Sequence, residues 1–230
     1  MCGRFTNQYT WRELHALYSL SDESFPTSNF PRRFNIAPTQ TAPVVRLKDG
    51  VREIAFLKWG LVPSWAKDTT GGAKMINAKA ETVADKPAFR SAFLRRRCLV
   101  VADGFYEWRK LSAKEKQPYF ITLKDGAPFA FAGLYEWWKP RDGSDLVETF
   151  TIITTEANEL VRPLHDRMPV ILPPEKWPLW LGEAKLSPNG LKGLLAPFPA
   201  KLMECWPVDK AVGNVKNDEP FLIAPLRALI

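Results

Sequence analysis

Residues 44–58, VVRLKDGVREIAFLK, contain the stretch that decides the fold of this 230-residue chain. Two runs of strand-forming residues are separated by Asp49-Gly50, and glycine accepts the positive φ that a two-residue hairpin turn requires. The same dipeptide recurs at Asp125-Gly126, again between two strand-like runs. The sequence therefore predicts hairpins at both places and a sheet in which antiparallel neighbours dominate.

Strand-forming runs continue along the chain, and the helical patterns are short. Thr10 and Glu13 have the spacing of a capping box at the start of a predicted helix. The expected strands are 44–48, 51–58, 97–102, 105–109, 119–124, 128–137, 148–155, 169–172 and 203–208; the expected helices are 10–20, 156–161, 174–181 and 191–195; and 21–42 is expected to be a loop. Strands and helices do not alternate regularly. This pattern predicts an α+β fold, a single domain over residues 1–230 with a mostly antiparallel, barrel-like β-sheet core flanked by short helices.

The composition is that of an ordinary globular protein with an excess of positive charge. Hydrophobic residues make up 46% of the chain and charged residues 25%, which excludes a disordered or collagen-like protein. Lys and Arg total 32 against 25 for Asp and Glu, a net charge of +7. This excess favours a polyanionic partner such as nucleic acid, although a merely basic protein has the same balance. No apolar run is long enough for a transmembrane helix, so we expect no membrane association.

Cysteine and histidine are too few and too scattered for a metal site. The three cysteines are an odd number without metal-like spacing, and only two histidines are present: Cys2, Cys98, Cys205, His15 and His165. We therefore expect reduced thiols, no metal and no cofactor.

Cys2 is the first candidate for chemistry. If the initiator Met is removed, the chain begins with a residue that carries an α-amine (ordinary pKa about 7.7–8.0) and a thiol (about 8.5) on adjacent carbons. The amine of such a 1,2-aminothiol condenses with an aldehyde to an imine, and the thiol then closes a thiazolidine. The alternative is a cysteine that merely happens to follow Met.

Two residues are candidates for proton transfer. Glu107 lies between aromatic residues in ADGFYEW (102–108). In a desolvated pocket its pKa would rise, which suits a general acid or base, whereas the alternative is an exposed strand glutamate. His165 lies in a turn rich in proline and charge, where it can transfer protons near neutral pH. The alternative there is a loop histidine bonded to backbone.

Residues 86–97, KPAFRSAFLRRR, carry five cations and no acidic residue. Two phenylalanines are interleaved with the cations, a combination that single-strand-binding proteins use for phosphate neutralisation and base stacking. Lys79, Arg4 and Arg167 are expected to extend the same surface. The alternative is the solvated basic face of a helix.

Eight sequence blocks, beginning with Cys2-Gly3-Arg4-Phe5, resemble those of one known family. The other seven are RFNIAP (33–38), WGLVPSW (59–65), INAKAET (76–82), ADGFYEW (102–108), IITT (152–155), HDRMP (165–169) and AVGNVKN (211–217). They occur in the family's order over almost the whole chain. The sequence is therefore similar to the SRAP (SOS-response-associated peptidase) proteins.

The resemblance implies a covalent reaction with abasic sites in DNA. It assigns the nucleophile to Cys2, orientation of the terminal amine and sugar to Asn77, proton transfer during deoxyribose ring opening to Glu107, and imine chemistry and crosslink reversal to His165. The residues it places on DNA are Arg4, Pro38, Trp65, Lys79, Arg90, Thr154 and Arg167. At position 79 this sequence has lysine where bacterial relatives usually have arginine. In the stretch 85–90 an arginine is absent from the place where the family leads us to expect one, and Arg90 is the candidate to substitute for it.

The implied partner is single-stranded DNA, or a strand junction, that contains an abasic site. The resemblance further implies a monomer without cofactor that removes residues preceding Cys2, located in the cytoplasm with the nucleoid of a bacterium or in a eukaryotic nucleus. Two other function classes fit the residues taken alone. An N-terminal-nucleophile cysteine amidohydrolase would turn over small amides, and a non-catalytic single-stranded-DNA-binding module would bind intact and abasic DNA alike.

Overall fold

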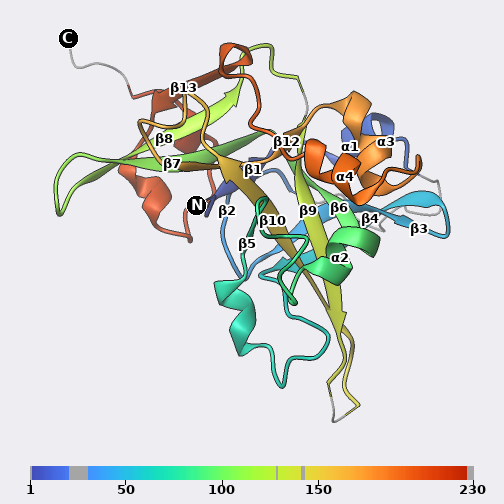
Figure 1. Ribbon diagram of the computed structural model, residues 1–230. Helices are drawn as coiled ribbons and strands as arrows, with labels where there is room; N and C mark the ends of the chain where they lie inside the picture. The colour runs from blue at the N-terminus through green and yellow to red at the C-terminus, as the bar shows by residue number, and fades with distance from the viewer. Residues whose placement is uncertain (1, 21–30, 128, 141–142, 227–230) are drawn as a thin grey trace.

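The computed structural model describes residues 2–20, 31–127, 129–140 and 143–226 (Figure 1). No helix in these ranges is long and apolar enough to cross a membrane. The expected α+β class is confirmed, with short helices around two sheets. Residues 21–30 of the predicted loop and residue 128 of a predicted strand lie outside the described residues.

The hairpin predicted from residues 44–58 is present. Strands β3 (Thr41–Lys48) and β4 (Val51–Trp59) pair antiparallel from Lys48↔Val51 onward. Asp49 and Gly50 have φ of 52° and 81°, so both turn residues are left-handed, as a type I′ turn requires.

The hairpin predicted at Asp125-Gly126 is wrong. Gly126 does adopt a positive φ of 63°. The flanking strands β8 (Lys116–Leu123) and β9 (Phe129–Trp138) nevertheless belong to different sheets. Both edges of β8 are already paired, with β7 (Gly104–Lys110) and β13 (Met203–Pro207). The turn therefore links two sheets, because β8 pairs with the preceding strand β7 and with the distant strand β13, which leaves it no free edge for β9.

One sheet closes on itself. Its order is β11-β10-β4-β3-β6-β9-β12, with β5 on β10, and an additional pairing of β10 with β9 makes a ring of strands. The pairings of β10 with β4 and β5 are parallel, and the others are antiparallel. Its remaining strands are β5 (Asn77–Lys79), β6 (Arg97–Ala102), β10 (Val147–Glu156), β11 (Arg167–Pro169) and β12 (Ile171–Leu172).

The second sheet is antiparallel, in the order β13-β8-β7-β1-β2. Its strands β1 (Phe5–Asn7) and β2 (Arg33–Ile36) were not predicted, nor was β5, because three or four residues are too few to show an alternating pattern. Strand β2 also corrects the expectation of a continuous loop over 21–42.

In the part of the chain that the structure describes, four short α-helices flank the sheets: α1 (Trp11–Tyr18), α2 (Arg90–Arg95), α3 (Trp177–Leu181) and α4 (Pro188–Gly193). Helix α1 begins with the predicted capping box of Thr10 and Glu13. The helix predicted over 156–161 is wrong. Glu156 ends β10, and the Asn158 side chain accepts the backbone N–H groups of Leu160 and Val161, which holds a turn in place of a helix.

Among the described residues, three hydrophobic clusters lie between and around the sheets. One lies between the two sheets and contains side chains from both, such as Phe105 and Phe131. A second packs α1, α2 and α3 against the ring of strands, and Figure 1 shows α1, α3 and α4 grouped on one side. A third covers the outside of the antiparallel sheet with the C-terminal segment, including Val212 and Leu222. Cys2 belongs to the first cluster, so the candidate nucleophile lies between the sheets.

Candidate functional site

Cys2 lies three residues before β1 and is fully buried. Phe5 pairs with Phe105 of β7, and the Tyr106 backbone N–H donates to the Arg4 carbonyl at 3.0 Å. Continued toward the N-terminus, this register brings residues 2–3 alongside Glu107. Burial, followed by the Glu107 charge, raises the pKa of the Cys2 thiol, so the thiol keeps its proton at neutral pH.

Glu107 is a buried carboxylic acid. It lies on β7 with 3% of its surface exposed. The alternation of the strand places it on the same face as Phe105, toward the layer between the sheets that contains Cys2. Burial raises the pKa of Glu107 to about 7, so the group can both donate and accept a proton at neutral pH. The exposed-glutamate alternative is therefore wrong.

His165 lies in the turn between β10 and β11, beside Asp166. Its Nδ1 accepts the Arg167 backbone N–H at 2.9 Å and lies 2.8 Å from the Asp166 carboxylate. Burial lowers the pKa of His165, with the Asp166 charge acting in the opposite direction. The Asp166 charge also raises the pKa of Glu107, which places this turn in the same electrostatic cluster as Glu107. The lowered pKa favours a neutral imidazole at pH 7.

Asn77 begins β5, and its amide orientation is set by the Ile76 carbonyl. This oxygen accepts the Asn77 Nδ2–H at 3.0 Å, the Trp59 indole N–H at 2.9 Å and the Ile152 backbone N–H at 3.1 Å. The Asn77 Oδ1 atom is buried and accepts no hydrogen bond from the described residues. It is therefore an acceptor available to a donor such as an ammonium group or a sugar hydroxyl.

Three of the expected DNA contacts meet around β10. In register, Thr154 lies between Lys79 of β5 and Pro169 of β11. Arg167 donates to the Thr154 carbonyl at 2.6 Å and makes a two-pronged ion pair with Glu81 at 2.6 and 2.9 Å. Lys79 is exposed, whereas Thr154 is buried, with 1% of its surface exposed. The main contribution of Thr154 is therefore the carbonyl oxygen that accepts the hydrogen bond from Arg167.

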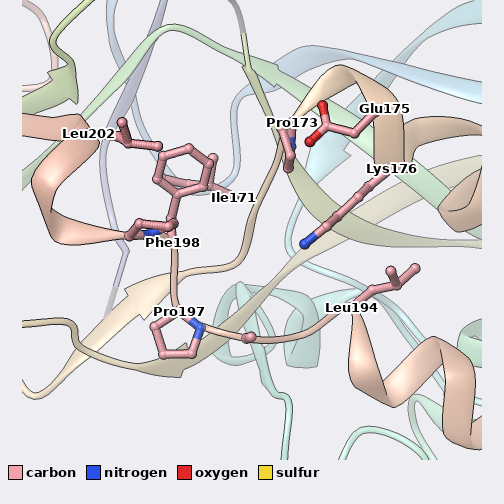
Figure 2. A pocket seen from close by; sticks show the side chains of 10 residues that line it. Ile171, Pro173, Glu175, Lys176, Leu194, Pro197, Phe198 and Leu202 are labelled. Carbon is pink, nitrogen blue, oxygen red and sulfur yellow. The ribbon is translucent and has the colours of Figure 1, made fainter.

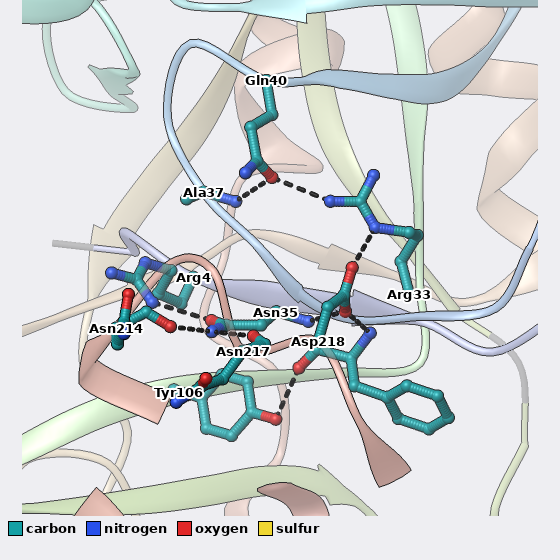
Figure 3. Close-up of polar contacts among 10 residues, drawn as sticks. Arg4, Arg33, Asn35, Ala37, Gln40, Tyr106, Asn214, Asn217 and Asp218 are labelled. Atoms are coloured by element: carbon teal, nitrogen blue, oxygen red, sulfur yellow. Dashed lines mark hydrogen bonds and ion pairs between the residues drawn. The ribbon is translucent and has the colours of Figure 1, made fainter. Parts of the chain in front are cut away.

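Arg4 is anchored by the C-terminal segment, in a network that joins three parts of the chain (Figure 3). Its guanidinium donates to the Asn35 Oδ1 at 2.7 Å and the Val212 carbonyl at 2.6 Å. Asn35 Nδ2 donates in turn to the carbonyls of Asn214 and Asn217. The network thus fixes the backbone immediately after Cys2.

Asp218 closes the same network from the other side. Its carboxylate accepts the Asn35 backbone N–H at 2.9 Å and pairs with the Arg33 guanidinium. Arg33 also donates to Gln40 at 2.9 Å, and this holds the loop that carries the half-buried Pro38. Asn35 and Asn217 belong to the blocks that carried the family resemblance, but their spacing gave no sign of this contact.

Trp65 is the most exposed aromatic residue of the expected site, at 67%. It lies on the loop 60–75, whose backbone is pinned by the Trp138 indole N–H to the Ala66 carbonyl at 2.7 Å. Gly60 and Gly72 pack backbone to backbone at the base of this loop. The loop therefore presents Trp65 to solvent from a fixed base.

The basic segment 86–97 differs from the expectation of interleaved, accessible aromatics. Phe89 and Phe93 are 7% and 0% exposed and belong to the core under α2. Arg96 pairs with Glu136, and Arg97 donates to backbone carbonyls. The phenylalanines alternate with cations because this segment is amphipathic, with the phenylalanines on the face that packs on the core. The two rings therefore cannot stack on bases. Arg90 is exposed on α2, which packs on β6 and β9, away from the strands that carry Cys2 and Glu107.

A pocket of about 220 Å³ lies apart from these residues, between β12 and α4 (Figure 2). Prolines, Phe198 and Leu194 line it, together with Glu175 and Lys176. None of the expected site residues lines it. In the described ranges, no group of three His, Cys, Asp or Glu side chains is placed to hold a metal ion.

The model of the family described as SOS response associated peptidase (SRAP) matches residues 1–215. The abasic site processing protein YoaM of Bacillus subtilis is 43% identical over 97% of both chains. The abasic site processing protein YedK of Escherichia coli is 33% identical over 98% of this chain and all of its own. HMCES of Gallus gallus, another abasic site processing protein, is 31% identical over 84% of this chain and 66% of its own.

A solved structure has the same fold. The crystal structure of a protein from Bacteroides thetaiotaomicron superposes with a TM-score of 0.87 at 30% identity, covering 97% of this chain and 99% of its own. Together, the ordered motifs, the fold and these relatives show that the chain belongs to the SRAP family.

Proposed function

We propose that this protein binds single-stranded DNA at abasic sites and forms a covalent thiazolidine crosslink through Cys2. The observation that carries the proposal is a buried cysteine at the second position of the chain beside Glu107, whose pKa lies near 7, and near the His165–Asp166 turn. The abasic site processing activity for which the relatives are named supports an abasic site as the substrate.

The chemistry requires proton transfers at fixed places. An abasic deoxyribose is mostly a closed hemiacetal, and Glu107 removes the proton of the C1′ hydroxyl while the ring oxygen gains one, which exposes the aldehyde. After removal of Met1, the Cys2 amine adds to C1′, and loss of water leaves an imine. The thiol sulfur then bonds to C1′ as its proton moves to nitrogen. Overall, aldehyde and aminothiol give thiazolidine and one water.

The neighbouring groups have complementary tasks. Asn77 Oδ1 accepts a hydrogen bond from the amine or the sugar, which keeps the nucleophile aimed at C1′. Neutral His165 takes a proton from the amine during imine formation and returns one during reversal. The thiazolidine protects the strand, because an unsealed imine leads to β-elimination. We include in the proposal that the chain itself removes residues preceding Cys2, with the Cys2 thiol as nucleophile.

The phosphates and bases contact the surface around this site. Arg4, Lys79 and Arg167 supply cations, and Pro38 and Trp65 separate the bases on either side of the lesion. Lys79 offers a point charge where arginine would offer a planar fork, so its phosphate contact is less directional. Arg90 contributes a more distant charge from α2.

Denaturing electrophoresis tests the proposal. The protein is mixed with a single strand that contains one abasic site and, separately, with the intact strand, and intact mass measures the loss of Met1. We expect a heat-stable adduct with the abasic strand only, from the chain that begins at Cys2. An adduct formed equally by a chain that retains Met1 would contradict the thiazolidine. Binding of both strands without an adduct would indicate a non-catalytic module, and turnover of small amides would indicate an amidohydrolase.

A further inference from the structure

Glu81 is an acidic residue among the cations that are expected to contact DNA. It lies two residues after the end of β5, close in sequence to Lys79. Its carboxylate accepts two hydrogen bonds from the Arg167 guanidinium, at 2.6 Å from Nη1 and 2.9 Å from Nη2. A negative charge at this place repels a DNA phosphate, so Glu81 lowers the affinity for DNA unless it contributes to binding in another way.

The Arg167 side chain crosses β10 to reach Glu81. Arg167 begins β11, which pairs with one edge of β10, whereas β5 pairs with the other edge. The Thr154 carbonyl on β10 accepts a hydrogen bond from Arg167 Nη2 at 2.6 Å and another from the Ala80 backbone N–H at 2.8 Å. Three hydrogen bonds therefore hold the guanidinium on the side of β10 where β5 lies.

The ion pair between Glu81 and Arg167 has a defined geometry. The Arg167 side chain is 14% exposed and the Glu81 side chain is 52% exposed. A mostly buried guanidinium that makes two parallel hydrogen bonds to one carboxylate keeps a single orientation, unlike an exposed ion pair with one contact. The hydrogen bonds from Arg167 lower the pKa of Glu81, against the smaller effect of partial burial, so the pair stays ionised at neutral pH.

One N–H group of Arg167 remains for a ligand. A guanidinium has five N–H groups, and Glu81 and Thr154 accept three of them. The Nε atom is buried and has no hydrogen-bond partner among the described residues. The contact of Nη1 with Glu81 is exposed to solvent. The second N–H of Nη1 is therefore the group that can reach a phosphate.

We infer that Glu81 is a positioning residue, which holds the Arg167 guanidinium where it meets a phosphate of the bound strand. Glu81 itself does not touch the DNA, and the ion pair stays intact in the complex. A guanidinium that is already oriented loses little side-chain entropy on binding, and this gain exceeds the repulsion between Glu81 and the phosphate. The inference rests on the proposed function for the identity of the strand.

The test measures the sign of a change in affinity. Glu81→Gln keeps the length of the side chain and removes the negative charge, so charge alone would tighten the binding of DNA. Anisotropy titrations use a fluorescent single strand that carries tetrahydrofuran in place of the abasic sugar, which prevents the covalent step. The proteins are the wild type, Glu81→Gln, Arg167→Ala and the double variant. Urea unfolding verifies that each variant is folded.

Glu183→Gln is the matched control. Glu183 makes the same two-pronged contact with Arg52, at 2.5 and 3.0 Å, and Arg52 also donates to the backbone carbonyl of Tyr18. The two arginine side chains are buried to a similar extent. Arg52 lies on β4 and Glu183 follows α3, and neither element carries a residue of the proposed site. The control therefore removes the same charge and weakens an equivalent ion pair outside that site.

We expect Glu81→Gln to weaken binding about tenfold, the contribution of one charge-assisted hydrogen bond. The magnitude of the salt slope should fall by about 0.7, the value for one phosphate. In the Arg167→Ala background the same substitution should cost no affinity, because no guanidinium remains to be positioned. Glu183→Gln should stay within about twofold of the wild type, because salt screens a distant charge.

Three results would overturn the inference. They are unchanged or tighter binding by Glu81→Gln, an equal loss with and without Arg167, and a loss of unfolding free energy with an unchanged salt slope, which would indicate a purely structural role. Failure of the proposed function gives a different result. If the wild type binds the tetrahydrofuran strand and Glu81→Gln shows the expected loss, but abasic DNA gives no adduct, the proposed function fails and the positioning role stands.

Discussion

At the scale of single residues, Glu107 has a pKa raised to about 7 because its carboxyl group is buried between the sheets. The folded protein therefore holds this proton more tightly than the unfolded chain does. The stabilisation is fully present below the ordinary pKa of 4.5 and is lost as the pH rises to about 7. Relative to Glu107→Gln, the wild type should lose about 3 kcal/mol of unfolding free energy between pH 4.5 and pH 8. Urea unfolding at several pH values measures this, and parallel curves for the two proteins would mean that Glu107 does not titrate as a buried acid.

The same substitution separates proton transfer from binding. Glu107→Gln keeps the shape of the side chain but cannot exchange a proton, so adduct formation should slow by about 10²–10⁴-fold while affinity for a strand with a stable abasic analogue is retained. His165→Ala should change imine formation and adduct reversal more than affinity. Single-turnover gels and anisotropy titrations give the two readouts. Wild-type rates of formation and reversal in both variants would remove these residues from the mechanism.

Cys2 contains two nucleophiles that one substitution can separate. Cys2→Ala leaves the terminal amine and deletes the thiol, so an imine forms but no ring closes. We expect no heat-stable adduct without reductant, some adduct after borohydride, and more strand cleavage by elimination. Cys205→Ala is the matched control, because this half-buried thiol lies on β13, remote in sequence from the chain start, and Cys98→Ala should also behave as the wild type. An unreduced, stable adduct from Cys2→Ala would show that the thiol does not seal the lesion.

At the scale of elements, the loop 60–75 depends on two glycines that touch. Gly60 has φ of +127°, and a Cβ there would lie 2.7 Å from the Gly72 carbonyl oxygen. This loop leads directly into Ile76, whose carbonyl orients Asn77. Gly60→Ala should therefore cost about 2–3 kcal/mol of unfolding free energy and also slow adduct formation.

Gly71→Ala is the control for this loop, because nothing lies within 4 Å of a Cβ at Gly71. Thermal and urea unfolding measure stability, and single-turnover gels measure the reaction. If Gly60→Ala is as stable and as fast as Gly71→Ala, the contact of the two glycines does not position the site.

At the scale of the whole molecule, the net charge of +7 should make DNA binding strongly dependent on salt. Each phosphate neutralised on a single strand contributes about −0.7 to the slope of log affinity against log salt. The contacts proposed for Arg4, Lys79 and Arg167 predict a slope of about −2 on a short strand. Lys79→Ala should reduce its magnitude by about 0.7, whereas Lys192→Ala on α4 should leave it unchanged. A flat salt dependence would contradict binding through phosphates.

Some features of this protein follow from the sequence by itself, since their causes are local. The turn at Asp49-Gly50 needs only glycine's access to positive φ, and α1 begins where Thr10 and Glu13 can cap each other. The α+β class followed from the balance of strand and helix patterns. The pairing of an amine and a thiol on Cys2 also needs no fold, and the ordered motifs were sufficient to indicate the family.

Other features were decided by the tertiary structure, because they depend on neighbours distant in the chain. Asp125-Gly126 has the same turn chemistry as Asp49-Gly50, yet its strands part into two sheets, since β8 already has partners on both edges. Phe89 looks like a stacking platform in the sequence but faces the core once α2 docks. Glu107 acquires a pKa near 7 only when both sheets remove its carboxyl group from water. Burial and charge are sums over all neighbours, and only the folded chain determines which neighbours those are.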